Sequence, residues 1–259
     1  MVLTPETLAF LAGSALTAGC IDAMAGGGGL ITLPALMAVG VPPVAAVGTN
    51  KLQSTIGTTG ACIAFARKGH LDYRTVVRPV VAAFVGSLGG AWLLQRVSPS
   101  ILAGLMPALL VLIAGYFTFA RGISAKDKAS RAGPAVIALL VGVVGFYDGF
   151  FGPGAGAFYA TIFLALAGLG LVRATAHAKA ANLASNVAGL GALILGGHVL
   201  WLAGLTMACG SMIGGQIGSH LAMRFGGRII RPLLIVMSLA LTAKLLIDPK
   251  NPIHIYLFG

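Results

Sequence analysis

The chain has 259 residues, of which 58% are hydrophobic and only 9% are charged, with a formal net charge of +11. A mean hydropathy of +0.96 excludes an ordinary soluble globular domain. Most basic residues stand in short loops between apolar segments, where the positive-inside rule places them, so the charge indicates membrane orientation and no nucleic-acid partner is expected.

Apolar segments follow one another along the whole chain, and a helix that crosses the hydrocarbon core needs about 20 mainly apolar residues. The pattern therefore predicts an all-α polytopic membrane protein. In the first half, we expect a helix at residues 6 to 22, a glycine-rich break and a short segment at 29 to 41. Helices are then expected at 44 to 66, 73 to 95 and 100 to 120. In the second half, the same order is expected at residues 133 to 149, 155 to 168, 173 to 196, 199 to 222 and 229 to 247.

The two halves carry a repeated polar pattern. Asp22 recurs as Asp148 at an offset of 126, and Lys51 recurs as Lys179 at an offset of 128. Apolar residues match by chance in any membrane protein, whereas matching aspartates and lysines do not. The chain therefore divides into a first transmembrane repeat at 1–121, a basic cytoplasmic linker at 122–132 and a second repeat at 133–259.

Basic loop residues decide how the repeats are oriented. If five segments per half cross the membrane, one face receives 12 of the 17 basic residues: Arg67, Lys68, Arg74, Arg78, Arg121, Lys126, Lys128, Arg131, Arg173, Arg224, Arg228 and Arg231. This distribution favours two inverted repeats, with both termini on the extracytoplasmic side. A fold in which the short segments dip in and return would place one basic loop outside.

Each half has an aspartate shortly before a glycine-rich break. Irregular backbone at membrane depth is tolerated only where it is buried in protein or lines a wet cavity. The short helices that follow direct free N–H groups and a positive dipole end toward a bound anion. Paired breaks at equivalent positions are typical of transporter sites, so Gly27, Gly28 and Gly154 are candidate substrate contacts. Close helix packing by the glycines is the alternative.

Lys51 and Lys179 lie inside apolar helices, where burying the charge of a lysine costs free energy unless the lysine is paired or has a functional role. Their equivalent positions favour contact with a substrate or an ion pair over snorkelling to the interface. Asp22 and Asp148 are natural partners for them, so a purely stabilising role stays open.

Polar side chains surround the two lysines. Spacing of three or four residues gives Asn50 and Ser54 a common helix face, and likewise Asn182 and Asn186. Such a face presents amide and hydroxyl donors to one cavity, although interhelical hydrogen bonding alone is the competing explanation. The candidate substrate-binding side chains are Lys51, Lys179, Asn50, Gln53, Ser54, His177, Asn182 and Asn186.

Signals for catalysis are weak. The sequence has no Cys/His pair with metal-ligand spacing, no G-x-S-x-G motif and no complete phosphate-binding loop. We expect no enzyme activity, no metal and no cofactor.

Four motifs carry a family resemblance: DAMAGGGGL at 22–30, GTNKLQ at 48–53, GFYDGFFGP at 145–153 and TAHAK at 175–179. They resemble the TauE/SafE family of sulfite exporters and sulfonate permeases over essentially the whole chain. The resemblance implies a bacterial inner-membrane protein that moves a small sulfur-containing anion, such as sulfite, a sulfonate or a related organic acid. Asp22 and Asp148 would then serve as proton-coupling groups or hinge anchors.

The resulting hypothesis is a secondary transporter that binds a small anion between its halves and rocks one repeat against the other. A passive anion channel and a non-transporting membrane subunit are the alternatives. The sequence leaves the oligomeric state open.

Overall fold

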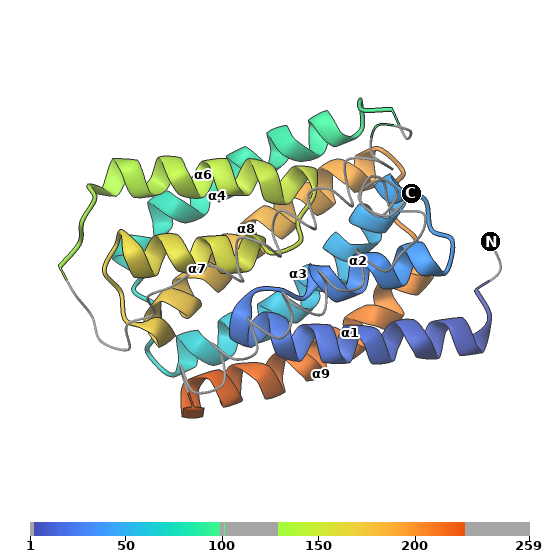
Figure 1. Ribbon diagram of the computed structural model, residues 1–259, viewed down its shortest axis with the longest axis horizontal. Coiled ribbons are helices and arrows are strands. Elements are labelled where there is room, and N and C mark those ends of the chain that lie inside the picture. The colour runs from blue at the N-terminus through green and yellow to red at the C-terminus, as the bar shows by residue number, and fades with distance from the viewer. Residues whose placement is uncertain (1–2, 99–100, 102–128, 226–259) are drawn as a thin grey trace, which may run out of the picture.

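The computed structural model describes residues 3–98, 101 and 129–225, and these form eight α-helices and no strand (Figure 1). The all-α fold is confirmed. The predicted segments at 100 to 120 and 229 to 247, and most of the linker at 122–132, lie outside the described residues. The helices are α1 (Pro5–Ala25), α2 (Gly29–Ala38), α3 (Pro43–Arg67), α4 (Tyr73–Leu94), α6 (Pro134–Phe150), α7 (Ala155–Ala165), α8 (Leu171–Leu195) and α9 (Trp201–Phe225).

Helix ends differ from the predicted ones by a few residues. The largest difference that concerns the site is at α1, which continues through Ala25, so Asp22 lies in its last turn and not at its end. Thr4 caps the start of this helix by accepting a hydrogen bond from the backbone N–H of Thr7, and Gly26 ends it in a left-handed conformation.

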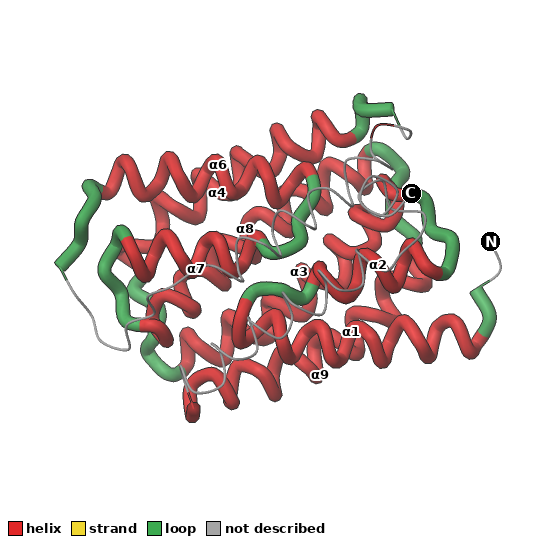
Figure 2. The backbone as a smooth tube through the Cα atoms, in the orientation of Figure 1, coloured by secondary structure: helices red, strands yellow, loops and turns green. Residues whose placement is uncertain are grey.

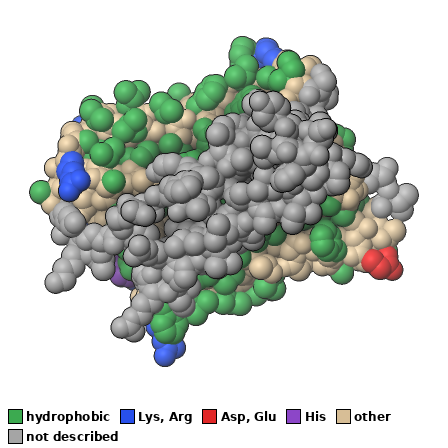
Figure 3. All heavy atoms as spheres, in the orientation of Figure 1, with side chains coloured by type: hydrophobic (Ala, Val, Ile, Leu, Met, Phe, Trp, Pro, Cys, Tyr) green, Lys and Arg blue, Asp and Glu red, His purple; other side chains and the backbone are tan. Residues whose placement is uncertain are grey.

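Three of the described helices, α1, α4 and α8, are long and apolar enough to cross a membrane. α2 and α7 have 10 and 11 residues, which gives each a length of about 15 Å, half of the roughly 30 Å hydrocarbon core. In the described parts visible in Figure 3, hydrophobic side chains gather along the upper and lower margins, and the Lys and Arg side chains lie at the extremities. These features fit a polytopic membrane protein that combines full-length and half-length helices.

The helices of the two halves pack in a matched way. α9 packs against α1 and α3, and α4 packs against α6 and α8. A Cβ atom at Gly86 would lie 2.1 Å from the carbonyl oxygen of Gly142, and one at the equivalent Gly214 would lie 2.0 Å from that of Leu16. In Figure 1 the chain runs along α1 in the opposite direction to α6. The inverted repeat itself stays a prediction, with its fifth segments outside the described part of the chain.

Charge separates the two ends of the helix array. At one end, Phe65, Leu171 and Ala222 share an apolar cluster, and at the other end Leu3, Val97 and Val199 pack into another. The first end, called the basic end below, carries Arg67, Lys68, Arg74, Arg78, Arg131, Arg173 and Arg224. Of the described lysines and arginines outside the core, only Arg96 lies at the opposite end.

Candidate functional site

Two glycine-rich loops meet in the middle of the protein, one between α1 and α2 and one between α6 and α7 (Figure 2). Gly26 has φ 77°, and a Cβ atom there would lie 2.3 Å from the backbone of Gly156 and Ala157. Only glycine fits such a position, because both the backbone conformation and the available space exclude a side chain. The breaks therefore bring the two halves into direct backbone contact.

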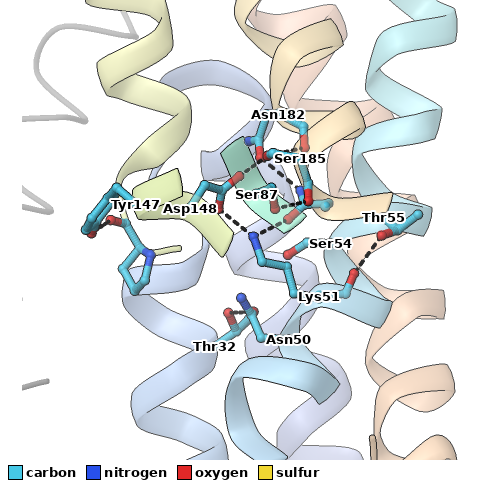
Figure 4. A network of polar contacts seen from close by, with 12 residues as sticks. Thr32, Asn50, Lys51, Ser54, Thr55, Ser87, Tyr147, Asp148, Asn182 and Ser185 are labelled. Atoms are coloured by element: carbon cyan, nitrogen blue, oxygen red, sulfur yellow. Dashed lines mark hydrogen bonds and ion pairs between the residues drawn. The ribbon is translucent and has the colours of Figure 1, made fainter. Parts of the chain in front are cut away.

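Two buried ion pairs cross between the halves. Lys51 Nζ of α3 lies 2.6 Å from Asp148 Oδ1 of α6, and Lys179 Nζ of α8 lies 2.6 Å from Asp22 Oδ2 of α1. Both lysine side chains are almost completely buried, so neither reaches the membrane surface by snorkelling. Figure 4 shows the Lys51 ammonium group pointing to Asp148. Each broken helix thus supplies the carboxylate that neutralises a lysine of the opposite half.

The two pairs have different surroundings. Asp148 is 3% exposed and also accepts a hydrogen bond from the Ser185 hydroxyl, while Lys51 donates to Asn186 Oδ1 at 3.0 Å. The side chain of Asp22 is 22% exposed and accepts the backbone N–H of Gly28 at 3.1 Å. The residue of the first half that corresponds to Ser185 is Gly57, so Asp22 lacks the matching hydroxyl. Asp22 is therefore the more accessible of the two carboxylates.

A small polar cavity, called the central cavity below, lies between the ion pairs. Its volume is about 20 Å³, which is room for about one water molecule. Carboxylates, amides, a hydroxyl and glycines of both halves form its wall: Asp22, Gly26, Gly29, Asn50, Ser54, Asp148, Gly152, Gly154, Gly156, Asn182 and Asn186.

Hydrogen bonds orient the asparagine side chains of this wall. Asn50 Oδ1 accepts from Thr32 Oγ1 at 2.5 Å and from Gln53 Nε2 at 2.8 Å. Asn182 Oδ1 accepts from Asn186 Nδ2 at 2.9 Å. Because the oxygens are occupied within the protein, the amide NH₂ groups of Asn50 and Asn182 are left to donate into the cavity. One donor group from each half suits an anion.

Comparison with known proteins identifies the chain. The family model described as "Sulfite exporter TauE/SafE" matches residues 11–245. The chain belongs to the TauE/SafE family. The family resemblance expected from the four motifs is thus confirmed, and membership in this family supports a membrane transporter.

Curated relatives of this TauE/SafE chain cover nearly its whole length. It is 44% identical over 251 residues to "Probable membrane transporter protein ORF9" of Sinorhizobium sp, covering 96% of both chains. It is 43% identical over 248 residues to "Probable membrane transporter protein YfcA" of Escherichia coli K12, covering 95% of this chain and 92% of the relative. A "Probable membrane transporter protein" of Haemophilus influenzae is 40% identical over 244 residues, covering 94% and 96%. No solved structure matches the chain significantly.

Most of the predicted site residues of this TauE/SafE chain lie at or next to the central cavity. Asp22, Asn50, Ser54, Asp148, Gly154, Asn182 and Asn186 line the central cavity. Gly28 and Gln53 line an adjoining pocket of about 10 Å³, and Gln53 Oε1 there is buried without a hydrogen-bond partner in the described structure. Lys51 and Lys179 contact the carboxylates of the central cavity but are not among its described lining residues. Gly27 is in the described lining of neither cavity.

His177 lies elsewhere. It is buried, its Nδ1 donates to the carbonyl oxygen of Arg173 at 2.8 Å, and its Nε2 is 3.3 Å from Thr75 Oγ1. These contacts place it toward the basic end, at a different cavity.

Thr32 was not among the predicted site residues of this TauE/SafE member. It is fully buried in α2 and fixes the orientation of Asn50. The sequence could have indicated Thr32, because it is the one residue with a hydroxyl group in the otherwise apolar sequence of α2.

Proposed function

We propose that the protein is a secondary transporter of a small anion that binds at the central cavity between the two halves. Sulfite, a sulfonate or a related organic acid is the proposed class of substrate, in keeping with the description of the family. The observation that carries the proposal is the convergence of amide donors and two lysine–aspartate pairs, contributed by both halves, on one polar cavity.

Binding requires the site to open. The central cavity has room for about one water molecule, whereas sulfite alone has four non-hydrogen atoms. The two glycine loops form the cavity wall, and they are also where the halves touch. Rocking of one half against the other would separate these loops and admit the anion, as in alternating access.

The lysines would meet the anion only after losing their present partners. In the closed arrangement each ammonium group is neutralised by a carboxylate 2.6 Å away. A proton on the carboxylate would free the ammonium group for the anion without leaving an unpaired charge in the membrane interior. This exchange would couple one proton to one anion.

Asp22 is the proposed proton site, because its side chain is 22% exposed, against 3% for Asp148. Asp148 would act as the hinge anchor, since Lys51 and Ser185 hold it from two sides. Lys179 would then be the lysine that exchanges its carboxylate for the substrate.

The proposed orientation places the basic end in the cytoplasm of a bacterium, following the positive-inside rule. Thr4 then lies on the extracytoplasmic side of the inner membrane, with the C-terminus expected on the same side.

Binding measurements on the purified protein test the proposed site. Calorimetric titration with sulfite, thiosulfate, sulfonates and carboxylates should find at least one binding anion, with affinity reduced about tenfold by Asn50→Ala or Asn182→Ala through the loss of a hydrogen bond to a charged group. Thr206→Ala is the matched control, since this hydroxyl lies away from the described linings of the central cavity and donates within α9 to the carbonyl oxygen of Leu202. Equal affinity in both asparagine variants would remove the central cavity as the binding site.

A further inference from the structure

A second and much larger cavity lies at the basic end. It has a volume of about 440 Å³ and is enclosed by the first turns of α4, α6 and α8 and the last turns of α7. This volume is in the range of cavities that hold small organic ligands. The cavity shares no lining residue with the central cavity.

Three guanidinium groups give this cavity a positive mouth. Arg74 and Arg78 are four residues apart on α4 and therefore share one helix face, and Arg173 approaches from α8. Among the residues that the structure describes, Asp72 is the acidic neighbour of these arginines. It caps α4 by accepting the backbone N–H of Arg74 at 3.0 Å, and this hydrogen bond holds the pKa of the Asp72 carboxyl below its ordinary value. In the described part of the chain, three arginines thus stand near one carboxylate, so positive charge predominates among the described side chains of the mouth.

The inner wall of the cavity is mainly apolar. Ile137 and Phe163 are buried and belong to one hydrophobic cluster. The ring of His177 lies 5.6 Å from the ring of Phe163, and its hydrogen bond to Arg173 fixes its orientation. The guanidinium groups thus suit the charged group of an organic anion, and the apolar wall beneath them suits its hydrocarbon part.

This cavity does not follow the repeat. At the offset of 128, the positions of Arg74, Arg78 and Arg173 correspond to Leu202, Thr206 and Ala45. The central ion pairs, in contrast, are matched between the halves. The cavity is thus a feature of one membrane face alone, added to the repeated framework.

We propose that the cavity at the basic end is a second binding site, which takes an organic anion composed of one oxyanion group and an apolar body. Arg78 and Arg173 hold the oxyanion, since guanidinium groups bind sulfonate, phosphate and carboxylate oxygens through paired hydrogen bonds. Phe163 and Ile137 contact the body. Two sources present this chemistry: a free organic anion, and the phosphate group of an anionic lipid.

The test uses the purified full chain in neutral detergent after removal of bound lipid. Calorimetric titration with benzenesulfonate is compared with inorganic sulfate, which lacks the apolar body, and with methyl phenyl sulfone, which lacks the charge. The second arm uses protein purified without the lipid-removal step, and native mass spectrometry measures the phosphatidylglycerol that it retains.

The double variant Arg78→Gln/Arg173→Gln should lower benzenesulfonate affinity by about tenfold or more if the ligand is a free anion, and should lose phosphatidylglycerol if it is a lipid. Arg131→Gln removes a charge from the same end without touching the cavity and should change neither value. Benzenesulfonate binding that Asn182→Ala lowers and the double variant leaves intact belongs to the central cavity, which separates the two sites. The proposal is overturned if the double variant and Arg131→Gln behave alike in both arms, or if sulfate and benzenesulfonate bind equally.

Discussion

Lys51 and Asp148 are 97 residues apart in the sequence, yet their charged groups lie 2.6 Å apart in the interior of the protein. Lys179 and Asp22 repeat this contact with the halves exchanged. Each lysine is held by the helix that precedes the glycine break of the other half, so the proposed binding region coincides with the contact between the halves. A change at either pair should therefore affect both stability and transport.

Lys51→Met should lower the free energy of unfolding by about 3–5 kcal/mol, because it leaves Asp148 as an uncompensated buried charge. Unfolding of the purified protein by titration with SDS measures this loss. Lys68→Met is the control, since Lys68 is exposed at the basic end and should change stability little.

The double variant Lys51→Met/Asp148→Leu should recover most of that loss, because an apolar pair can replace a buried ion pair at small cost. If Lys51→Met is as stable as the unmodified protein, the buried pair described here does not contribute to the fold.

The two aspartates should differ in their response to neutralisation. Each substitution leaves a buried ammonium group without its counter-charge. Asp148→Asn does so where the carboxylate is 3% exposed, whereas at Asp22 the side chain is 22% exposed and the Asn oxygen still accepts the Gly28 amide. We expect Asp148→Asn to reduce the yield of monodisperse protein more strongly, and Asp22→Asn to fold while losing proton-dependent transport. Size-exclusion chromatography and flux assays on the same preparations check this order, and a reversed order would refute the assigned roles.

Gly26→Ala should destabilise the protein by at least about 2 kcal/mol, because the added methyl group meets the backbone of the opposite loop at a positive φ. Gly13→Ala is the matched control in the same helix, since a Cβ atom at Gly13 has nothing within 4 Å. Its stability should be equal or up to about 1 kcal/mol higher. Thermal unfolding of both variants provides the comparison, and similar midpoints would contradict the close contact of the loops.

Orientation can be tested with single cysteines in a background from which Cys20, Cys62 and Cys209 have been replaced by alanine. A membrane-impermeant maleimide added to intact spheroplasts should label Thr4→Cys and leave Lys68→Cys unlabelled until the membrane is opened. Labelling in the opposite order would place the basic end outside and invert the proposed topology.

Much of the fold could be predicted because the membrane imposes simple rules. Long apolar runs predicted six of the eight described helices within a few residues, and the glycine breaks marked the two half-length helices α2 and α7. The aspartates and lysines were recognisable because ionisable groups in a membrane interior need partners.

Other features depend on packing that no local pattern encodes. Which aspartate pairs with which lysine follows from how the helices are placed in the folded protein, and the sequence alone permitted pairs within a half as well. His177 is a polar residue two positions before Lys179, which made it a candidate for the site. In the folded helix its side chain faces Thr75 and not the central cavity. Thr32 acts through Asn50, a contact that only the folded short helix creates.

Proton-coupled transport through the central cavity can be measured in proteoliposomes under an imposed pH gradient, with the tightest-binding anion of the panel as labelled substrate. We expect the unmodified protein to concentrate the anion above its equilibrium level, a protonophore to abolish this accumulation, and Asn182→Ala to reduce it strongly. Equilibration without accumulation would instead indicate a passive channel, and unchanged accumulation in Asn182→Ala would place the path of the anion outside the central cavity.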